Sequence, residues 1–284
     1  MAALMLAPVV AALCARDSDF RTIVWSSGQQ RELLDQALLA FQIAVDRDLF
    51  GVMQPDQSLA ELTAALVTGF AVTIADMPPD RLLVQGDTTT AFAAALAAYC
   101  QRIPVAHVEA GLRSHDRFHP FPEEINRRYI TAIADIHFTP TSAAADALRS
   151  EGVDTVAIHV TGNTIVGALM SVRSRLEAPD GFGLTSRVVR DLAAGSPIIL
   201  VTCHRRENFG VNLAAILRAV RRIAIAHPAH RGLAELVGVD EDRIVARATE
   251  LLAQFSSMTS SPSSNPFGDG RASERIADVL ANIP

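Results

Sequence analysis

Short apolar runs alternate with longer helical stretches along this chain, and this alternation constrains the fold more than any other feature. The runs at residues 81–85 and 103–108 each have the length of a buried strand, and an alanine-rich stretch that ends near Cys100 separates them. Further short runs predict strands at 22–25, 136–139, 156–160 and 198–202. Strands that alternate with helices are typical of βα units in a parallel sheet, so we expect an α/β fold.

The stretches between these runs predict the helices. The first fifteen residues are almost entirely apolar, but they lack a basic segment and Pro8 interrupts them, so we expect a core-facing helix rather than a signal peptide or a membrane span. No other segment is expected to reach the length of a membrane span. Further helices are predicted at 30–41, 58–75, 143–149, 173–190, from about 212 onward and at 272–281, and 256–264 is expected to be a serine-rich linker.

Two acidic residues follow the first two runs directly. Asp87 lies in the segment Gly-Asp-Thr-Thr-Thr after the first run, and Glu109 ends the second. Ligands of open α/β sheets bind at the carboxyl ends of the strands, where these carboxylates are expected to lie. Asp is also a good helix N-cap, so Asp87 could simply begin the next helix; the two roles are compatible.

Two further residues in this region have simple structural explanations. Glu123 follows Pro122 in a pattern typical of a helix start, where the helix dipole favours carboxylates. Taken alone, that pattern predicts only a helix start. His107 lies inside an apolar run, and we expect it to be a packed or hydrogen-bonded core residue rather than a catalytic one.

Composition excludes several classes of function. The 284 residues are 49% hydrophobic, which suits two modest domains, and the net charge of -6 offers no basic field for nucleic acid. All 25 basic residues counted as Lys or Arg are arginine, so a P-loop lysine, a Schiff-base lysine and a lysine general base are excluded. Cys14, Cys100 and Cys203 are odd in number and scattered, which favours reduced thiols in a cytoplasmic protein and suggests no metal site.

Several segments occur in an order that identifies a family. His-Val-Glu-Ala-Gly-Leu-Arg at 107–113 follows the Gly-Asp-Thr-Thr-Thr segment, and Thr-Gly-Asn-Thr begins at 161. Thr-Cys-His-Arg-Arg-Glu-Asn-Phe-Gly at 202–210 and Asn-Pro-Phe-Gly-Asp-Gly at 265–270 complete the set. Together they closely resemble the non-hydrolysing UDP-N-acetylglucosamine 2-epimerases, with gaps, over about residues 7–276.

The resemblance implies two Rossmann-like domains of the glycosyltransferase-B type, with the nucleotide sugar between them. The implied division is an N-terminal domain at 1–163, a second domain at 164–264 and a closing helix at 265–284. Enzymes of the family eliminate UDP from UDP-N-acetylglucosamine and add it back to give UDP-N-acetylmannosamine. The resemblance also implies a cytoplasmic homodimer that needs no cofactor or metal and has neither nucleic acid nor membrane as a partner.

The resemblance assigns roles to particular residues. Asp87, Glu109 and Glu123 occupy the acid and base positions, and His204 the position that helps to hold or neutralise the leaving phosphate. Candidate substrate contacts are Arg113, Arg205, Arg206 and Gln29. A guanidinium suits phosphate oxygens, but structural ion pairs of these arginines, such as a helical pair of Glu123 with Arg127, are an equal alternative.

Two departures from the family pattern predict a defective chain. The family's opening strand and Gly-Thr-Arg-Pro-Glu-Ala turn are missing, and Met5 aligns with a family lysine; since that strand is central in a doubly wound sheet, its absence predicts a break in the ladder. After residue 230 the chain passes almost directly to 236–240, which resembles a much later part of the family, so the second domain is expected to be truncated.

Three functions therefore remain open from the sequence. The first is the UDP-N-acetylglucosamine 2-epimerase itself. The second is a catalytically impaired remnant that at most binds a nucleotide sugar or pairs with an intact partner subunit. The third is a hydrolysing 2-epimerase that releases free N-acetylmannosamine.

Overall fold

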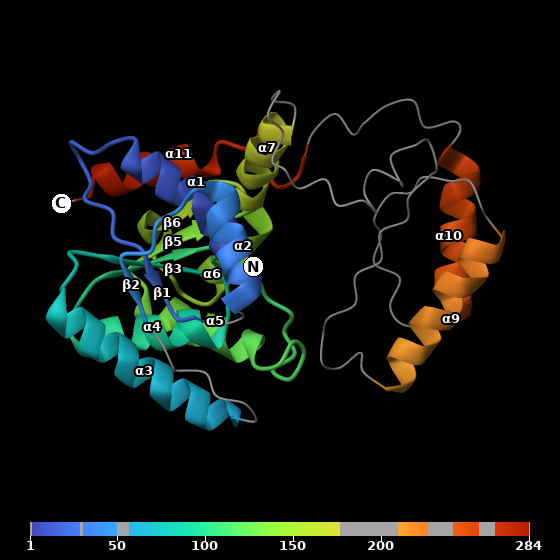
Figure 1. Cartoon of the computed structure of the whole chain (residues 1–284), viewed down its shortest axis with the longest axis horizontal. Coiled ribbons are helices and arrows are strands. Elements are labelled where there is room, and N and C mark those ends of the chain that lie inside the picture. Colours follow the sequence, from blue (N-terminus) through green and yellow to red (C-terminus); the bar gives the residue numbers. More distant parts are fainter. Residues whose placement is uncertain are drawn as a thin grey trace. The chain divides into compact units, whose positions relative to one another are not determined.

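A computed structural model describes residues 2–28, 31–49, 57–176, 210–226, 241–255 and 265–283. The chain divides into two compact units, shown in Figure 1. The first contains Met1–Pro179 and Ser264–Pro284, and the second contains Asp180–Ser263. The first unit is thus assembled from both ends of the chain.

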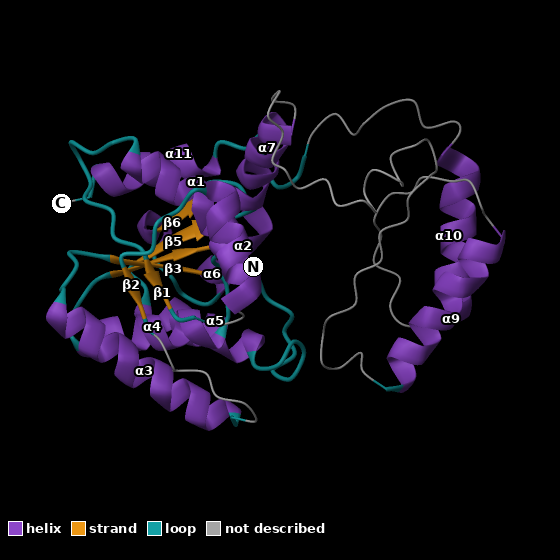
Figure 2. Cartoon of the chain, in the orientation of Figure 1, coloured by secondary structure: helices purple, strands orange, loops and turns teal. Residues whose placement is uncertain are grey.

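The six strands found among the described residues of the first unit form two parallel sheets (Figure 2). The larger sheet has the order β3 (Leu82–Gln85), β4 (Val105–Val108), β5 (Ile136–Thr139) and β6 (Ile158–Val160). The smaller is the pair β1 (Trp25–Ser26) and β2 (Arg47–Asp48). Among the described residues no ladder joins the two sheets. The parallel pairing confirms the predicted α/β class.

Alternate residues of the central strand β4 face two different cores. Val105 packs in one cluster with Val84, whereas Ala106 and Val108 pack in another with Phe138. All four residues of β4 are buried. A strand covered on both faces requires a continuous apolar run, which is why this segment shows no alternation of apolar and polar residues.

Three helices cover the first face of the sheet: α3 (Leu59–Asp76), α4 (Thr89–Cys100) and α5 (Glu123–Ile133). The α3 helix begins with a capping box between Ser58 and Glu61 and buries Leu66, Phe70 and Ile74. The α4 helix contacts α3 and contributes only small buried side chains to the same cluster, Ala91, Ala93, Ala94, Ala95, Ala97 and Ala98. Alanine at these positions allows close packing of the two helices.

The other face is covered by α1 (Ala2–Cys14) and α11 (Ala272–Ala281), on the opposite side of the sheet from α3 and α4 in Figure 1. Val9 and Leu13 of α1 pack in one cluster with Ile276 of α11. The prediction that the apolar first residues form a core helix is confirmed. The α7 helix (Thr164–Leu176) contacts both α1 and α11.

The boundary between the two units lies after α7, whereas the sequence predicted a division at residue 164. The contacts of α7 with α1 and α11 explain this difference. Both α7 and the closing helix belong to the first unit, and the second unit begins only at Asp180. The remaining helices are α2 (Arg31–Phe41) and α6 (Ser142–Ser150) in the first unit and the paired α9 (Val211–Ala226) and α10 (Glu241–Phe255) in the second. The sequence had not predicted α10. The predicted strand at 198–202 and linker at 256–264 lie outside the described residues.

By length and composition alone, α3 could cross a membrane. No other helix in the described segments meets both criteria. The expectation that no segment reaches that length is therefore wrong for this helix. Leu66, Phe70 and Ile74 of this helix face the core and account for part of its apolar composition, but only 22% of the apolar stretch is buried. Its length and composition carry no further conclusion.

Candidate active site

Asp87 lies in a tight turn between β3 and α4. Gly86 adopts a left-handed φ of 71°, which reverses the chain directly after the strand. The N-cap of α4 is Thr88, whose hydroxyl accepts a hydrogen bond from the Ala91 N–H at 3.2 Å. The alternative in which Asp87 is the helix cap is therefore wrong. The carboxylate of Asp87 is left for other partners at the carboxyl end of the sheet.

Glu109 occupies the equivalent position after β4. Its backbone has a φ of 65°, an unusual conformation for a residue other than glycine. Two side-chain amides hold its carboxyl group: Gln85 Nε2 donates to Oε2 at 2.6 Å, and Asn163 Nδ2 donates to Oε1 at 3.1 Å. The amides come from the end of β3 and the start of α7, so three elements meet at this carboxyl group.

Burial and amide contacts give Glu109 an unusual environment. Burial is the largest influence and raises its pKa. The hydrogen bond from Asn163 lowers the pKa, repulsion from the nearby Asp87 raises it, and Arg127 and Gln85 lower it; the net pKa lies above the ordinary glutamate value. Glu109 can therefore hold a proton at a higher pH than an exposed glutamate.

The first turns of α5 bring two donors to the Asp87 turn. Arg127 donates a short hydrogen bond to the Asp87 carboxylate, and Asn126 Nδ2 donates to the Asp87 carbonyl oxygen at 2.9 Å. Glu123 begins this helix and is half-buried. Helical spacing of three and four residues places Glu123 near Asn126 and Arg127 on the helix surface. The structure thus brings Asp87 and Glu109 together, with Glu123 on the adjoining helix.

Arg113 was predicted to contact the substrate, but in the structure its guanidinium is bound by other residues of the protein. Its guanidinium donates to both oxygens of Glu151, at 2.7 Å from Nε and 2.7 Å from a terminal nitrogen, and also to Thr131 Oγ1 at 2.9 Å. Its side chain is only 1% exposed. This geometry favours the alternative of a structural ion pair, and the Arg113 hydrogen bonds also lower the pKa of Glu151.

His107 is fully buried and its Nε2 lies 2.8 Å from the Gly86 carbonyl oxygen. Burial, the largest influence, lowers its pKa to about 3. The expectation of a hydrogen-bonded core histidine is confirmed. Four other predicted site residues, Gln29, His204, Arg205 and Arg206, lie outside the described residues and remain predictions.

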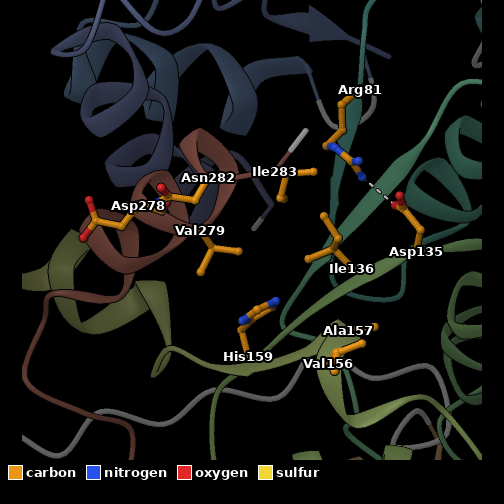
Figure 3. Close-up of a pocket in the computed structure, with 10 residues that line it drawn as sticks. All are labelled: Arg81, Asp135, Ile136, Val156, Ala157, His159, Asp278, Val279, Asn282 and Ile283. Atoms are coloured by element: carbon orange, nitrogen blue, oxygen red, sulfur yellow. Dashed lines mark hydrogen bonds and ion pairs between the residues drawn. The ribbon is translucent and has the colours of Figure 1, made fainter.

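Neither a metal cluster nor a cavity of the described segments coincides with these carboxylates. Within the described segments, no group of three or more His, Cys, Asp or Glu side chains could hold a metal ion. A cavity of about 550 Å³ lies at the opposite end of the sheet, where Arg81 and Asp135 form an ion pair just before β3 and β5 (Figure 3). It contains neither Asp87 nor Glu109.

Comparison with known proteins shows which family the chain belongs to. The family model described as UDP-N-acetylglucosamine 2-epimerase matches residues 12–233. The chain belongs to the UDP-N-acetylglucosamine 2-epimerase family. A UDP-N-acetylglucosamine 2-epimerase of Escherichia coli O157:H7 is 35% identical, with 99% of this chain and 96% of the relative covered. A probable UDP-N-acetylglucosamine 2-epimerase of Ralstonia nicotianae is 43% identical over 227 residues, which cover 80% of this chain but only 60% of the relative's length.

Solved epimerase structures share the fold. The crystal structure of the Neisseria meningitidis UDP-GlcNAc 2-epimerase bound to UDP-GlcNAc is similar with a TM-score of 0.89 and 29% identity. The match covers 98% of this chain and 96% of that chain. The fold therefore belongs to the two-domain glycosyltransferase-B-like class that the sequence resemblance implied.

The predicted truncation of the second domain is not supported, because these matches run nearly from end to end of the relatives. The alignment with the Escherichia coli relative covers 367 positions, whereas this chain has 284 residues. The alignment therefore contains insertions or deletions, although it covers 99% of this chain and 96% of the relative.

Sequence reasoning missed the three side chains that hold the carboxylates, Gln85, Arg127 and Asn163, and it also missed Asn126, which holds the Asp87 backbone. Gln85 had been assigned only to the end of a strand, and Arg127 only to a possible surface pair. Asn163 lies in the Thr-Gly-Asn-Thr segment that contributed to the family resemblance, but the sequence analysis assigned no role to this residue. A polar side chain that ends a buried strand, as Gln85 does, is the general signal that could have identified such a residue.

Proposed function

We propose that this protein is a non-hydrolysing UDP-N-acetylglucosamine 2-epimerase that interconverts UDP-N-acetylglucosamine and UDP-N-acetylmannosamine. Membership of the family supports the substrate and the reaction. The observation that carries the proposal is the contrast between Asp87, paired with the Arg127 guanidinium, and the half-buried Glu109, held between two neutral amides. Two neighbouring carboxyl groups with different surroundings suit the two roles of base and acid.

The reaction requires both roles. Elimination breaks the C2–H bond and the bond from C1 to the UDP oxygen, a double bond forms between C1 and C2, and UDP leaves with the electron pair. The C2 proton passes to a carboxylate base. UDP then adds back to the face of C1 that it left, so C1 keeps its configuration. A proton is delivered to C2 on the face opposite the one from which the first proton was taken, and this inverts C2. No electron acceptor is consumed, so the chemistry balances without a redox cofactor.

Each predicted residue has a place in this scheme. Asp87, Glu109 and Glu123 are proposed to exchange protons, and His204 to neutralise the leaving phosphate. Arg205, Arg206 and Gln29 are proposed substrate contacts. Arg113 keeps at most an indirect role, since its guanidinium is already occupied by Glu151.

Turnover in heavy water tests the proposed reaction. The purified chain is incubated with UDP-N-acetylglucosamine, and the products are separated and analysed by NMR and mass spectrometry. We expect deuterium at C2 of both epimers, because the abstracted proton exchanges with solvent. Conversion without label at C2 would contradict elimination and re-addition.

The same assay separates the alternatives. A hydrolysing 2-epimerase would release free N-acetylmannosamine and UDP in equal amounts. An impaired remnant would bind UDP-N-acetylglucosamine, as measured by calorimetry, without converting it. Asp87→Asn serves as the inactive control for background hydrolysis.

We also propose that the protein is a cytoplasmic homodimer. Exposed apolar side chains on the helices of one face support an interface there: Val72 on α3 is 66% exposed, Tyr99 on α4 is 62% and Tyr129 on α5 is 55%. The thiols of Cys14 and Cys100 are free and exposed, as expected of a reducing compartment. Sedimentation equilibrium tests the dimer, and a mass equal to that of one chain would contradict it.

A further inference from the structure

Glu124, next to the predicted acid or base Glu123, is a fully buried carboxyl group with no assigned role. Its side chain is 0% exposed, whereas neighbouring Glu123 is half-buried. A buried carboxylate is costly unless charged or N–H partners surround it. Glu124 has three such partners, which indicates that its position is specified by more than packing.

The partners of Glu124 belong to two different parts of the site. Its Oε2 accepts a hydrogen bond from the Ser114 N–H at 3.0 Å, which ties it to the loop after β4. The same oxygen lies 3.5 Å from a terminal nitrogen of Arg127. Its Oε1 accepts from Arg128 Nε at 3.1 Å. The carboxylate therefore joins the loop that follows Glu109 to the helix that holds Asp87.

Arg127 divides its guanidinium between two carboxylates. One terminal nitrogen faces Glu124, and the other donates to Asp87. Its Nε is buried and has no hydrogen-bond partner among the described residues, and the side chain is only 11% exposed. The orientation of the guanidinium is thus set by the two carboxylates. Because a guanidinium is planar and rigid, fixing one end fixes the direction of the other.

We propose that Glu124 is a positioning residue that holds the Asp87 carboxylate in place through Arg127. The expected effect of Glu124 on turnover rests on the proposed epimerase function. Without the negative charge of Glu124, Arg127 keeps Asp87 as its only carboxylate and can rotate with it. Proton transfer depends steeply on geometry, so this loosening should lower the rate of the chemical step.

A double-mutant cycle tests this route of action. Glu124→Gln keeps the size of the side chain and removes its charge. Asp87→Asn removes the carboxylate on which Glu124 is proposed to act through Arg127. We expect Glu124→Gln to lower kcat by about tenfold or more with KM changed by less than about threefold. In the double variant we expect no loss beyond that of Asp87→Asn, because both changes act on the same group.

Arg128 offers a matched control. It is the other cationic side-chain partner of Glu124, but its own side chain is 42% exposed, and among the described residues it forms no hydrogen bond or ion pair with Asp87. Arg128→Gln should therefore leave kcat within about twofold of the wild type. An equal loss in Arg128→Gln, or multiplicative losses in the double variant, would show that Glu124 supports the fold in general and would overturn the proposal.

Equilibrium unfolding gives a readout that does not need activity. The cycle between Glu124→Gln and Asp87→Asn should show a coupling of at least about threefold in the unfolding equilibrium constant, and none is expected between Arg128→Gln and Asp87→Asn. Should Glu124→Gln fold poorly, Arg127→Lys, which keeps the charge but not the planar fork, replaces it in the same cycle. A wild type without epimerase activity would refute the proposed function, while the unfolding cycle would still decide the positioning role. Independent unfolding effects would overturn it.

Discussion

The guanidinium of Arg127 pairs with the carboxylate of Asp87, although the two residues lie 40 positions apart in the chain. Asp87 follows β3 and Arg127 lies in the second turn of α5, so the pair fixes the start of one βα unit against the helix of the next. The pair also places a fixed positive charge beside a carboxylate that the proposed reaction uses. The geometry leads to four predictions beyond the cycle described above.

Separate substitutions of Asp87 and Thr88 distinguish catalysis from helix capping. Asp87→Asn should lower kcat by about 10²–10⁴-fold, the usual contribution of general acid or base catalysis, and should leave the cap of α4 intact. Thr88→Ala should instead lower the free energy of unfolding by about 1 kcal/mol, because Thr88 is the residue that caps α4. Rate and thermal unfolding are measured on both variants. A wild-type rate in Asp87→Asn would remove Asp87 from the reaction.

Stability of the wild type relative to Glu109→Gln should depend on pH. The pKa of Glu109 is raised, mainly by burial, above the ordinary value of 4.5. The folded protein therefore binds this proton more tightly than the unfolded chain does. The tighter binding stabilises the fold below pH 4.5, and this stabilisation is lost as the pH rises through the folded pKa. Urea unfolding measured from below pH 4.5 to above the folded pKa should show that the free energy of unfolding of Glu109→Gln increases relative to that of the wild type.

Glu61 provides a control of opposite sign for this measurement. Hydrogen bonds from Ser58 lower the pKa of Glu61, so its stabilising effect is present above the unfolded pKa and is lost as the pH falls. Relative to the wild type, Glu61→Gln should not gain stability as the pH rises. The same pH slope for both variants would contradict the assigned environment of Glu109.

Arg113→Met should destabilise the protein without weakening UDP binding directly. The substitution leaves the Glu151 carboxylate without its bidentate partner. We expect a loss of about 2–3 kcal/mol, less than for a fully buried pair because Glu151 is 33% exposed. Chemical unfolding and calorimetric titration with UDP are the two measurements. Normal stability combined with a weakened Kd would restore Arg113 as a substrate contact.

Gly111 and Gly152 form a matched pair for a steric test. Both have a left-handed φ, 85° and 86°. A Cβ on Gly111 would lie 2.2 Å from the Ala144 carbonyl oxygen, whereas a Cβ on Gly152 would meet nothing within 4 Å. Gly152→Ala should therefore cost about 1 kcal/mol of stability from backbone strain alone.

Gly111→Ala should cost more than about 4 kcal/mol, because it adds a clash with the α6 backbone to the same strain. It should also impair turnover, since Gly111 is two residues from Glu109. Comparable Tm values for the two variants would show that α6 can shift away from the turn after β4.

Much of the first unit could be predicted because its signals are local. The apolar run at 136–139 coincides with β5, and the predicted closing helix coincides with α11. The first turn of a helix is also local, so the start of α5 at Glu123 was predicted from Pro122 and the two carboxylates. The helix α10 has no strong starting signal and was missed.

The partners of the carboxylates could not be predicted, because they depend on contacts between distant segments. Asn163 is 54 positions from Glu109, and no local pattern relates the two. Thr88 and Asp87 both satisfy the preference for an N-cap, and only the backbone geometry of the turn shows that Thr88 is used. Arg113 has the right chemistry for phosphate, but Glu151 occupies it from 38 positions away.

The two amides on Glu109 also determine the direction in which it can exchange a proton. A carboxylate has about four lone-pair sites, two on each oxygen. Gln85 occupies one site on Oε2 and Asn163 one on Oε1. A proton on this group must therefore sit on one of the two remaining lone pairs, neither of which faces an amide. The stereochemistry of proton transfer at Glu109 is thus set by its neutral neighbours from β3 and α7 rather than by its own rotamer.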